Sequence, residues 1–463
     1  MVFSSLEFLF AYLPITLILY YSIPSIKWRN AVLFLVSLVF YAWGEPVYVL
    51  LMAVTILADY AFGYAIGVRR EAGKSTKALL VLACVFNLGI LFFFKYYNFI
   101  AENLRFLLPF LPELNVELPI GISFYTFQAL SYVIDVYRGD TEKQNNPIDF
   151  GAYVTMFPQL IAGPIVKYRE VADALKKRTV TLDSAASGVR VFIVGLAKKV
   201  LLADMASELW LTVTQSDSPS AAYAWFGIIM RTAQIYFDFS GYSDMAIGLG
   251  RILGFEFLEN FNYPYISKSI TEFWRRWHIS LSTWFREYVY IPLGGNRRGL
   301  LIQYRNMLVV WLLTGLWHGD SWNFVLWGLF YFVLLAVEKA VGKAHLEKIP
   351  SALRHLFTML AVMFGWVLFS FDKLGDMFSY IGAMLGKNGA FSGVELYDIT
   401  RTLPFLAILI LASTPLPKKL ADKFACKSEA RRIILDALGM LTLGLCCAYL
   451  VSSSYHPFLY FRF

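Results

Sequence analysis

Charged residues are scarce in this sequence. Of its 463 residues only 16% are Asp, Glu, Lys or Arg, while 58% are hydrophobic. Soluble globular chains carry about 25% charged residues. The apolar residues gather in runs close to the length of about twenty that a helix needs to cross a bilayer. The composition therefore excludes a soluble enzyme and predicts an all-α polytopic membrane protein in contact with the lipid bilayer.

Cysteine and the common catalytic motifs are also rare or missing. The four cysteines have no metal-ligand spacing and are expected to be inert thiols: Cys84, Cys426, Cys446 and Cys447. Neither a Gly-x-Ser-x-Gly elbow nor a His-Glu-x-x-His zinc motif occurs. We therefore expect no metal and no permanently bound cofactor. An enzyme with this sequence would work through histidine.

The net charge of +8 has two explanations, nucleic-acid binding or membrane topology. No basic stretch lies among stacking aromatic residues in a polar context, so we predict no nucleic-acid partner. Basic residues instead gather in the loop 67–77, and acidic residues gather in the next loop, 101–118. Because basic loops face the cytoplasm, the N-terminus is expected outside. The first segment lacks a basic n-region and a cleavage site and is expected to be a retained helix.

Eleven hydrophobic segments follow one another along the chain. They lie near 6–22, 31–43, 47–66, 78–100, 119–137, 187–213, 221–253, 307–338, 353–371, 401–413 and 432–452. No internal repeat and no soluble domain interrupts them, so a single domain over 1–463 is predicted.

Two stretches do not have the pattern of a plain membrane span. Residues 150–165 are apolar but short, and they contain Pro158, Gly163 and Pro164. Such a segment suits a re-entrant loop, whose backbone must be shielded by protein or by a water-filled cavity. Residues 268–290 alternate aromatic and arginine side chains, which predicts an amphipathic helix lying along the cytoplasmic interface.

His318 is the most informative single residue. It lies in the run LLTGLWHGDSWNFVLWG (312–328), which is otherwise apolar. A histidine hydrogen-bonded between two helices is the structural alternative, but an ionisable residue within a membrane span is a functional hypothesis by default. Burial keeps an imidazole neutral, and a neutral imidazole is a general base near pH 7. Asp320 could orient it only if the helix breaks at Gly319, because residues two apart do not face each other on a helix.

His278 is the second candidate, within RRWHIS beside Arg275 and Arg276. The positive neighbours favour its neutral form. An interfacial histidine needs no special explanation, so the structural alternative is stronger here. The other three histidines lie in loops or at segment edges and are treated as background: His345, His355 and His456.

Other polar side chains are candidates for a pocket or for contact with a substrate. Gln234 and Asp238 lie within an apolar segment and must face the protein interior. Asp238 could equally be a structural partner of Arg231 or Arg251, or line a pocket. Four basic residues could contact donor phosphates, although topology alone explains their charge: Lys167, Arg169, Arg297 and Arg298.

Several motifs, in order along nearly the whole chain, resemble those of one known family. They include VFYAWGEP, PIGISFYTFQALSYVIDVYRG (119–139), FPQLIAGPIVKY (157–168), QIYFDFSGYSDMAIG (234–248), IPLGGNRRG (291–299) and LTGLWHG (313–319). The chain resembles membrane-bound O-acyltransferases, specifically the bacterial branch that O-acetylates alginate and peptidoglycan. The resemblance implies about eleven to thirteen spanning or re-entrant helices around a central funnel, with a catalytic core over roughly 119–338.

The resemblance also implies roles for particular residues. His318 matches the catalytic histidine of the family and His278 matches its second site position. Trp317, His278 and backbone amides near Gly319 are candidates to stabilise the oxyanion.

The same resemblance implies the substrates and partner. Acetyl-CoA would be the cytosolic donor and an extracytoplasmic polysaccharide the acceptor, in a bacterial inner membrane. A secreted serine-esterase-like acetyltransferase would be the partner. Tyr460, in the aromatic tail 455–463, would be a transient acyl acceptor, with Tyr455 as the alternative. D-alanyl transfer from a carrier protein, or transport without chemistry, are the competing hypotheses.

Overall fold

The computed structural model describes residues 1–105, 107, 112, 114–452 and 458–459. Helices make up all the regular structure in these residues, and no strand occurs among them. The prediction of an all-α protein is therefore confirmed. Seven of the described helices are long and apolar enough to cross a membrane, and the bent pair α19 (Gly393–Ala412) and α20 (Leu416–Ala425) would make an eighth.

Contacts between Cα atoms group the chain into two compact units. The first unit comprises Met1–Phe192, Tyr242–Leu258 and Pro457–Phe463, and the second comprises Ile193–Gly241 and Glu259–His456. The long helix α11 (Ala221–Leu253) contributes to both units. That the chain folds as one domain stays a prediction.

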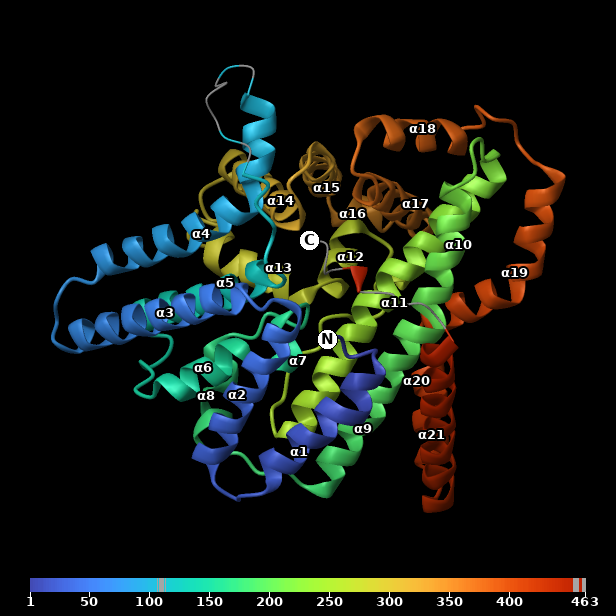
Figure 1. The fold of residues 1–463 in the computed structure, drawn as a ribbon. Helices are drawn as coiled ribbons and strands as arrows, with labels where there is room; N and C mark the ends of the chain where they lie inside the picture. The colour runs from blue at the N-terminus through green and yellow to red at the C-terminus, as the bar shows by residue number, and fades with distance from the viewer. Residues whose placement is uncertain (106, 108–111, 113, 453–457, 460–463) are drawn as a thin grey trace. The chain divides into compact units, whose positions relative to one another are not determined.

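The first unit is built from the N-terminal helices (Figure 1). Its helices are η1 (Phe8–Tyr12), α1 (Leu13–Tyr21), α2 (Ile26–Gly44), α3 (Tyr48–Glu71), α4 (Lys77–Leu104), α5 (Ile122–Arg138), α6 (Pro147–Thr155), α7 (Phe157–Leu160), α8 (Tyr168–Lys176) and most of α9 (Leu182–Ala197). Helices α3 and α4 lie side by side as a hairpin, where the buried side chains of Asp59 and Asn87 share a 2.6 Å hydrogen bond. This bond gives two otherwise apolar spans a fixed register.

The segment 150–165 is broken, as predicted for a re-entrant loop. Helix α6 ends at Thr155, α7 covers only four residues, and the whole stretch is buried. Pro158 and Pro164 prevent a continuous helix because proline lacks a backbone donor. Buried protein surroundings satisfy the condition for irregular backbone at membrane depth.

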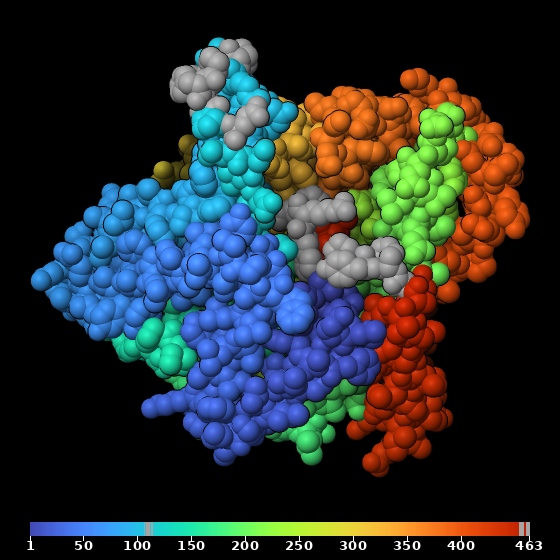
Figure 2. Space-filling view, viewed as in Figure 1, coloured from blue at the N-terminus to red at the C-terminus, as the bar shows by residue number. Residues whose placement is uncertain are grey.

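The second unit contains the helices that carry both candidate histidines. They are η2 (Lys198–Ala203), α10 (Asp204–Thr214), η3 (Pro264–Ile266), α12 (Ile270–Arg276), α13 (Ile279–Phe285), η4 (Arg286–Tyr290), α14 (Leu300–His318), α15 (Trp322–Val341), α16 (Lys343–Leu346), α17 (Ser351–Ser370), α18 (Leu374–Met384), α19, α20 and α21 (Glu429–Ser452). In α21 Cys446 is the one buried residue, and the exposed side chains include Ile433, Leu438 and Leu441. This helix forms the long red surface in Figure 2. Such a helix suits contact with lipid.

The prediction of one interfacial helix over 268–290 is wrong. The stretch folds as α12 and α13, which are separated by Trp277 and His278. Trp277 is buried instead of lying at an interface. The carboxylate of Glu338 accepts hydrogen bonds from the backbone N–H groups of Ile270 and Thr271, at 2.5 and 2.9 Å, and so caps the start of α12. Tertiary contacts of this kind outweigh an amphipathic pattern.

Helices α14 and α15 pack with their backbones in contact. A Cβ atom at Gly315 would overlap the carbonyl oxygen of Phe324, and one at Gly328 would overlap that of Trp311. Each glycine also lies against the Cα atom of the other. Two small residues thus allow the helix that ends at His318 to lie directly on its successor, as small residues do in membrane helix pairs.

Candidate active site

His318 is the last residue of α14 and is almost completely buried. Gly319 follows in extended backbone, and α15 begins at Trp322, so the helix breaks where the sequence predicted. The imidazole ring lies against two aromatic rings, with centroid distances of 5.0 Å to Trp327 and 5.2 Å to Phe369. Aromatic side chains therefore line the surroundings of this imidazole.

His278 lies in the turn between α12 and α13, in an unusual conformation. Its φ of 45° is left-handed, which is uncommon for a residue other than glycine. Its ring lies edge-on to Phe239 of α11, with centroids 4.7 Å apart. Burial of the ring lowers the pKa of His278 to about 3, so this imidazole is neutral at physiological pH.

Trp317 lies close to both histidines. Its indole centroid is 5.8 Å from the ring of His278 and 4.9 Å from the ring of His318. The structure therefore brings together three residues that the sequence singled out, inside one compact unit.

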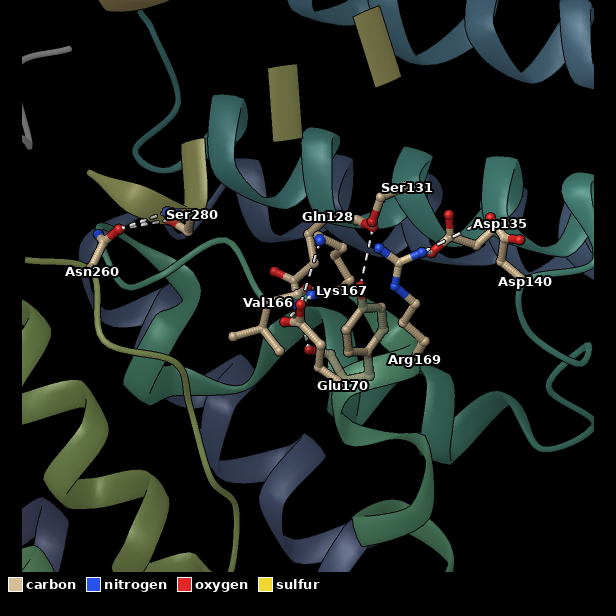
Figure 3. Close-up of polar contacts among 11 residues, drawn as sticks. Gln128, Ser131, Asp135, Asp140, Val166, Lys167, Arg169, Glu170, Asn260 and Ser280 are labelled. Carbon is tan, nitrogen blue, oxygen red and sulfur yellow. Dashed lines mark hydrogen bonds and ion pairs between the residues drawn. The ribbon is translucent and has the colours of Figure 1, made fainter. Parts of the chain in front are cut away.

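Asn260 is a contact of His278 that sequence reasoning missed. Its side-chain oxygen lies 3.3 Å from Nδ1 of His278. The same oxygen accepts hydrogen bonds from the backbone N–H and the hydroxyl of Ser280, both at 3.0 Å (Figure 3). Only 1% of Asn260 is exposed. Asn260 directly precedes the run FNYPY (261–265), and asparagines are common in such loops, so nothing in the sequence singles it out.

Asp320 does not contact His318. Its side chain is exposed, and no hydrogen bond or ion pair of Asp320 occurs in the described part of the chain. The orienting role considered for this carboxylate is therefore not supported. The break at Gly319 turns the chain so that Asp320 reaches the surface of the unit.

Asp238 is paired with a lysine that was not among the partners considered for it. Lys199 of η2 donates to Asp238 at 2.7 Å and contacts Asp204 at 2.8 Å, and all three side chains are buried. These three buried charges connect η2, α10 and α11, and removal of one would leave the others without compensation. Asp238 directly precedes Phe239, the residue that lies against His278.

Gln234 is part of a second polar contact on α11. It accepts from Arg231 at 2.8 Å and donates to Ser207 of α10 at 2.8 Å. Arg231 also donates to Ser370 at the end of α17. These bonds link three helices and account for a glutamine in an apolar segment.

Lys167 and Arg169 belong to the first unit and are engaged with acidic side chains (Figure 3). Lys167 is 4% exposed and lies 3.5 Å from Glu170, while Arg169 lies within 3.9 Å of Asp135 and Asp140. Arg297 and Arg298 of the second unit are exposed. The four basic residues suggested by the sequence are thus divided between the two units, with Lys167 and Arg169 in the first and Arg297 and Arg298 in the second.

A basic cavity that the sequence did not suggest lies in the second unit. It has a volume of about 830 Å³ and opens between α12, α14, α15, α16 and the start of α17. Four cations on its wall make no ion pair with a carboxylate in the described ranges: Lys268, Arg275, Lys339 and Arg354. Glu338, also on the wall, is occupied by the start of α12.

Three buried hydrogen-bond donors lie between this cavity and His318. Trp274 directly precedes the cavity residue Arg275 in the chain. The centroid of its ring lies 4.8 Å from that of Tyr331 and 5.5 Å from that of Trp327. The indole N–H groups and the Tyr331 hydroxyl find no acceptor among the described residues. Because buried polar groups are normally hydrogen-bonded, such a row suits a ligand that carries acceptors.

Comparison with known proteins identifies the family. The family model for membrane-bound O-acyltransferases matches residues 141–375. The probable alginate O-acetylase of Pseudomonas putida is 41% identical over the full length of both chains. That of Pseudomonas aeruginosa is 46% identical over 81% of this chain and 73% of its own. The peptidoglycan O-acetyltransferase of Helicobacter pylori is 34% identical over 84% and 80%.

The chain belongs to the membrane-bound O-acyltransferase family. It is therefore an enzyme of acyl transfer and a multi-pass membrane protein with bacterial relatives, and the hypothesis of a non-catalytic transporter is set aside. Both histidines and the basic cavity lie within the matched range 141–375.

The predictions about a tyrosine relay and about metal binding can be compared with the described residues only. Tyr460 and Tyr455 lie outside them, although Phe458 is described, buried, and 5.1 Å from the ring of Tyr242. No group of three or more metal-ligating side chains occurs among the described residues.

Proposed function

We propose that this enzyme moves acetyl groups from cytosolic acetyl-CoA towards hydroxyls of an extracytoplasmic polysaccharide. The observation that carries the proposal is the pair of buried histidines, His278 and His318, whose rings both lie near that of Trp317. The names of the relatives, alginate O-acetylase and peptidoglycan O-acetyltransferase, support an acetyl group and a polysaccharide acceptor.

The chemistry needs one base and no metal. An acceptor hydroxyl loses its proton to a neutral imidazole, which we assign to His318, as its oxygen attacks the thioester carbonyl carbon. The resulting oxyanion collapses, the carbon–sulfur bond breaks, and the sulfur leaves as a thiol after taking the proton. Buried aromatic walls strengthen the electrostatic interactions on which this sequence depends.

The basic cavity supports a donor that carries phosphates. Gln303 lines the cavity and His318 ends the same helix 15 residues later, a rise of about 22 Å along an α-helix. A long linear arm with amide carbonyls, such as pantetheine, would pass the donors of Trp274, Tyr331 and Trp327 on the way. This proposal replaces the four donor-contacting residues suggested by the sequence.

Tyr460 would relay the acetyl group to a partner outside the membrane. Its phenol oxygen would form an ester with the acetyl carbon while coenzyme A leaves as the thiol. A secreted serine-esterase-like acetyltransferase would then take the acetyl group to the polysaccharide. A Tyr460→Phe enzyme that acetylates polysaccharide at the normal rate in cells would overturn the relay.

Hydrolysis of acetyl-CoA by the purified protein tests the central proposal. We expect His318→Ala to abolish hydrolysis while the thermal unfolding midpoint is kept, and the exposed His345→Ala to leave hydrolysis unchanged. Equal rates in the His318 variant and the parent would contradict the assignment of the base.

A second experiment distinguishes the donor. Arg275→Ala and Lys339→Ala should raise KM for acetyl-CoA about tenfold, the value of one charged hydrogen bond, with kcat unchanged. Lys427→Ala, an exposed charge outside the cavity, is the matched control. Activity with a D-alanyl carrier protein and none with acetyl-CoA would favour D-alanyl transfer instead.

A further inference from the structure

Asn260 contacts His278 through a single oxygen atom that has three neighbours. The oxygen lies 3.0 Å from the backbone nitrogen of Ser280, 3.0 Å from its hydroxyl and 3.3 Å from Nδ1 of His278. The backbone carbonyl of Asn260 also accepts from the backbone N–H of Ile279 at 3.0 Å. One residue therefore contacts His278 and both residues that follow it.

The orientation of the Asn260 amide is fixed by the backbone of Ser280. The oxygen and nitrogen of an asparagine amide are interchangeable in most side-chain contacts. A backbone N–H, however, can only donate, so the atom 3.0 Å away from it must be the oxygen. A flipped amide would place two donors against each other in a buried site.

This orientation decides which nitrogen of His278 carries the proton. An amide oxygen can only accept, and a neutral imidazole has one N–H and one lone pair. The nitrogen that faces the oxygen of Asn260 is Nδ1. We propose that Asn260 is a positioning residue that holds the proton of His278 on Nδ1 and leaves the lone pair on Nε2.

The side chains with defined contacts to the His278 ring are Asn260, Ser280, Phe239 of α11 and Trp317 of α14. None of them is ionised near neutral pH. Ser280 donates its hydroxyl to Asn260 at 3.0 Å, shorter than its 3.5 Å separation from Nδ1, so it supports the same arrangement.

The tautomer determines whether Nε2 of His278 donates or accepts a hydrogen bond. With its one proton held towards Asn260, His278 offers Nε2 as a hydrogen-bond acceptor. It is thereby removed from the candidates that could donate to an oxyanion. Such a nitrogen can accept a hydrogen bond from the attacking hydroxyl group and align it, while His318 takes the proton. The inference rests on the proposed function only for this last step.

Nitrogen-15 NMR of histidine-labelled protein reads the tautomer without substrate. The five histidines are few enough for assignment, and the His278 signals are those lost in a His278→Asn variant. We expect a single neutral form with the proton on Nδ1 in the parent protein and in Ser280→Ala. In Asn260→Ala we expect both tautomers, together with about tenfold slower turnover, the effect of one net hydrogen bond.

Asn260→Asp is the conservative variant that keeps the acceptor. Its carboxylate accepts the same three donors and brings a negative charge near Nδ1, which raises the pKa of His278. Turnover should survive at high pH, and the acid limb of kcat against pH should move upward. A merely structural role would not move that limb.

Two results would overturn the proposal. One is a parent spectrum with the proton on Nε2, and the other is an Asn260→Ala spectrum identical to that of the parent. Both are measured on the resting protein, so they are independent of acetyl-CoA hydrolysis. Loss of the proposed function with the expected spectra would leave the tautomer assignment standing.

Discussion

The indole ring of Trp317 lies 5.8 Å from the imidazole of His278, centroid to centroid, and precedes His318 directly in the chain. The ring is 5% exposed. Its position means that a change in the size of residue 317 alters the surroundings of both histidines at once.

Replacement of Trp317 should separate packing from chemistry. Trp317→Phe keeps an aromatic ring and is expected to retain the fold with a modest loss of turnover. Trp317→Ala should lose about 3–5 kcal/mol of stability, as large-to-small core changes do, and nearly all acyl transfer. Denaturant unfolding and acetyl-CoA hydrolysis measure the two effects. Trp43→Ala, at a 65% exposed position, is the control, and an equal loss there would contradict the packing argument.

Gly315 should not tolerate a methyl group. Gly315→Ala would push against the backbone of Phe324, which cannot rotate away, and overpacking costs about 1–3 kcal/mol. We expect a lower unfolding midpoint and reduced hydrolysis. Gly439→Ala, in α21 with open space around its Cα, should instead be neutral or stabilising. Equal tolerance at both glycines would show that α14 and α15 can separate without cost.

Lys199 should be far more important for stability than an exposed lysine. Lys199→Met would leave the carboxylates of Asp204 and Asp238 buried without their cation, at a cost of about 3–5 kcal/mol. Lys343→Met removes an exposed pair with Glu347 and should cost less than about 1 kcal/mol. Unfolding in denaturant measures both.

A triple variant tests whether the charges or the shape of this cluster matter. Lys199→Met combined with Asp204→Asn and Asp238→Asn removes every charge and should recover much of the loss. Failure to recover stability would indicate that the link needs its ion pairs and not only its volume.

Because His278 is buried in its neutral form, the free energy of unfolding should decrease as the pH is lowered. Its pKa is about 3 in the folded protein and about 6.5 in the unfolded chain, so the unfolded state binds the extra proton between these values. Stability is complete above about pH 6.5 and declines as pH falls towards 3. At pH 4.5 the decline attributable to this residue is about 3 kcal/mol, because pH 4.5 lies two units below the unfolded pKa and each unit corresponds to about 1.4 kcal/mol.

The unfolding midpoint of His278→Gln provides the comparison. Glutamine does not titrate, so the variant should lose less stability than the parent between pH 7 and pH 4.5. Parallel losses in the two proteins would mean that His278 is protonated without penalty in the folded state.

The sequence predicted the break at Gly319 because a local signal marks it. Glycine and aspartate interrupt an apolar run, and neither suits a helix that faces lipid. The split of 268–290 had no such signal. His278 adopts a left-handed conformation through contacts with Asn260, and Glu338 caps α12 from 68 residues away. Periodicity carries no information about partners this distant.

The partner of Asp238 shows the same limit. Arg231 and Arg251 lie on the same helix and are natural candidates from spacing, yet Lys199, 39 residues earlier, forms the pair. Sequence predicts that a buried carboxylate needs a cation. Which cation it finds depends on how the helices pack.

The glycine contact between α14 and α15 has a consequence for substrate range. The backbones of α14 and α15 touch at Gly315 and Gly328, so the helix that ends at His318 has no room to shift. It therefore cannot adjust its position to acyl chains of different length. With His318 in its proposed role as the base, we expect the side chains around the imidazole, Trp327 and Phe369 foremost, to determine the chain-length preference. Substitution of these aromatic residues by smaller ones should allow longer acyl groups to bind without a change in helix packing.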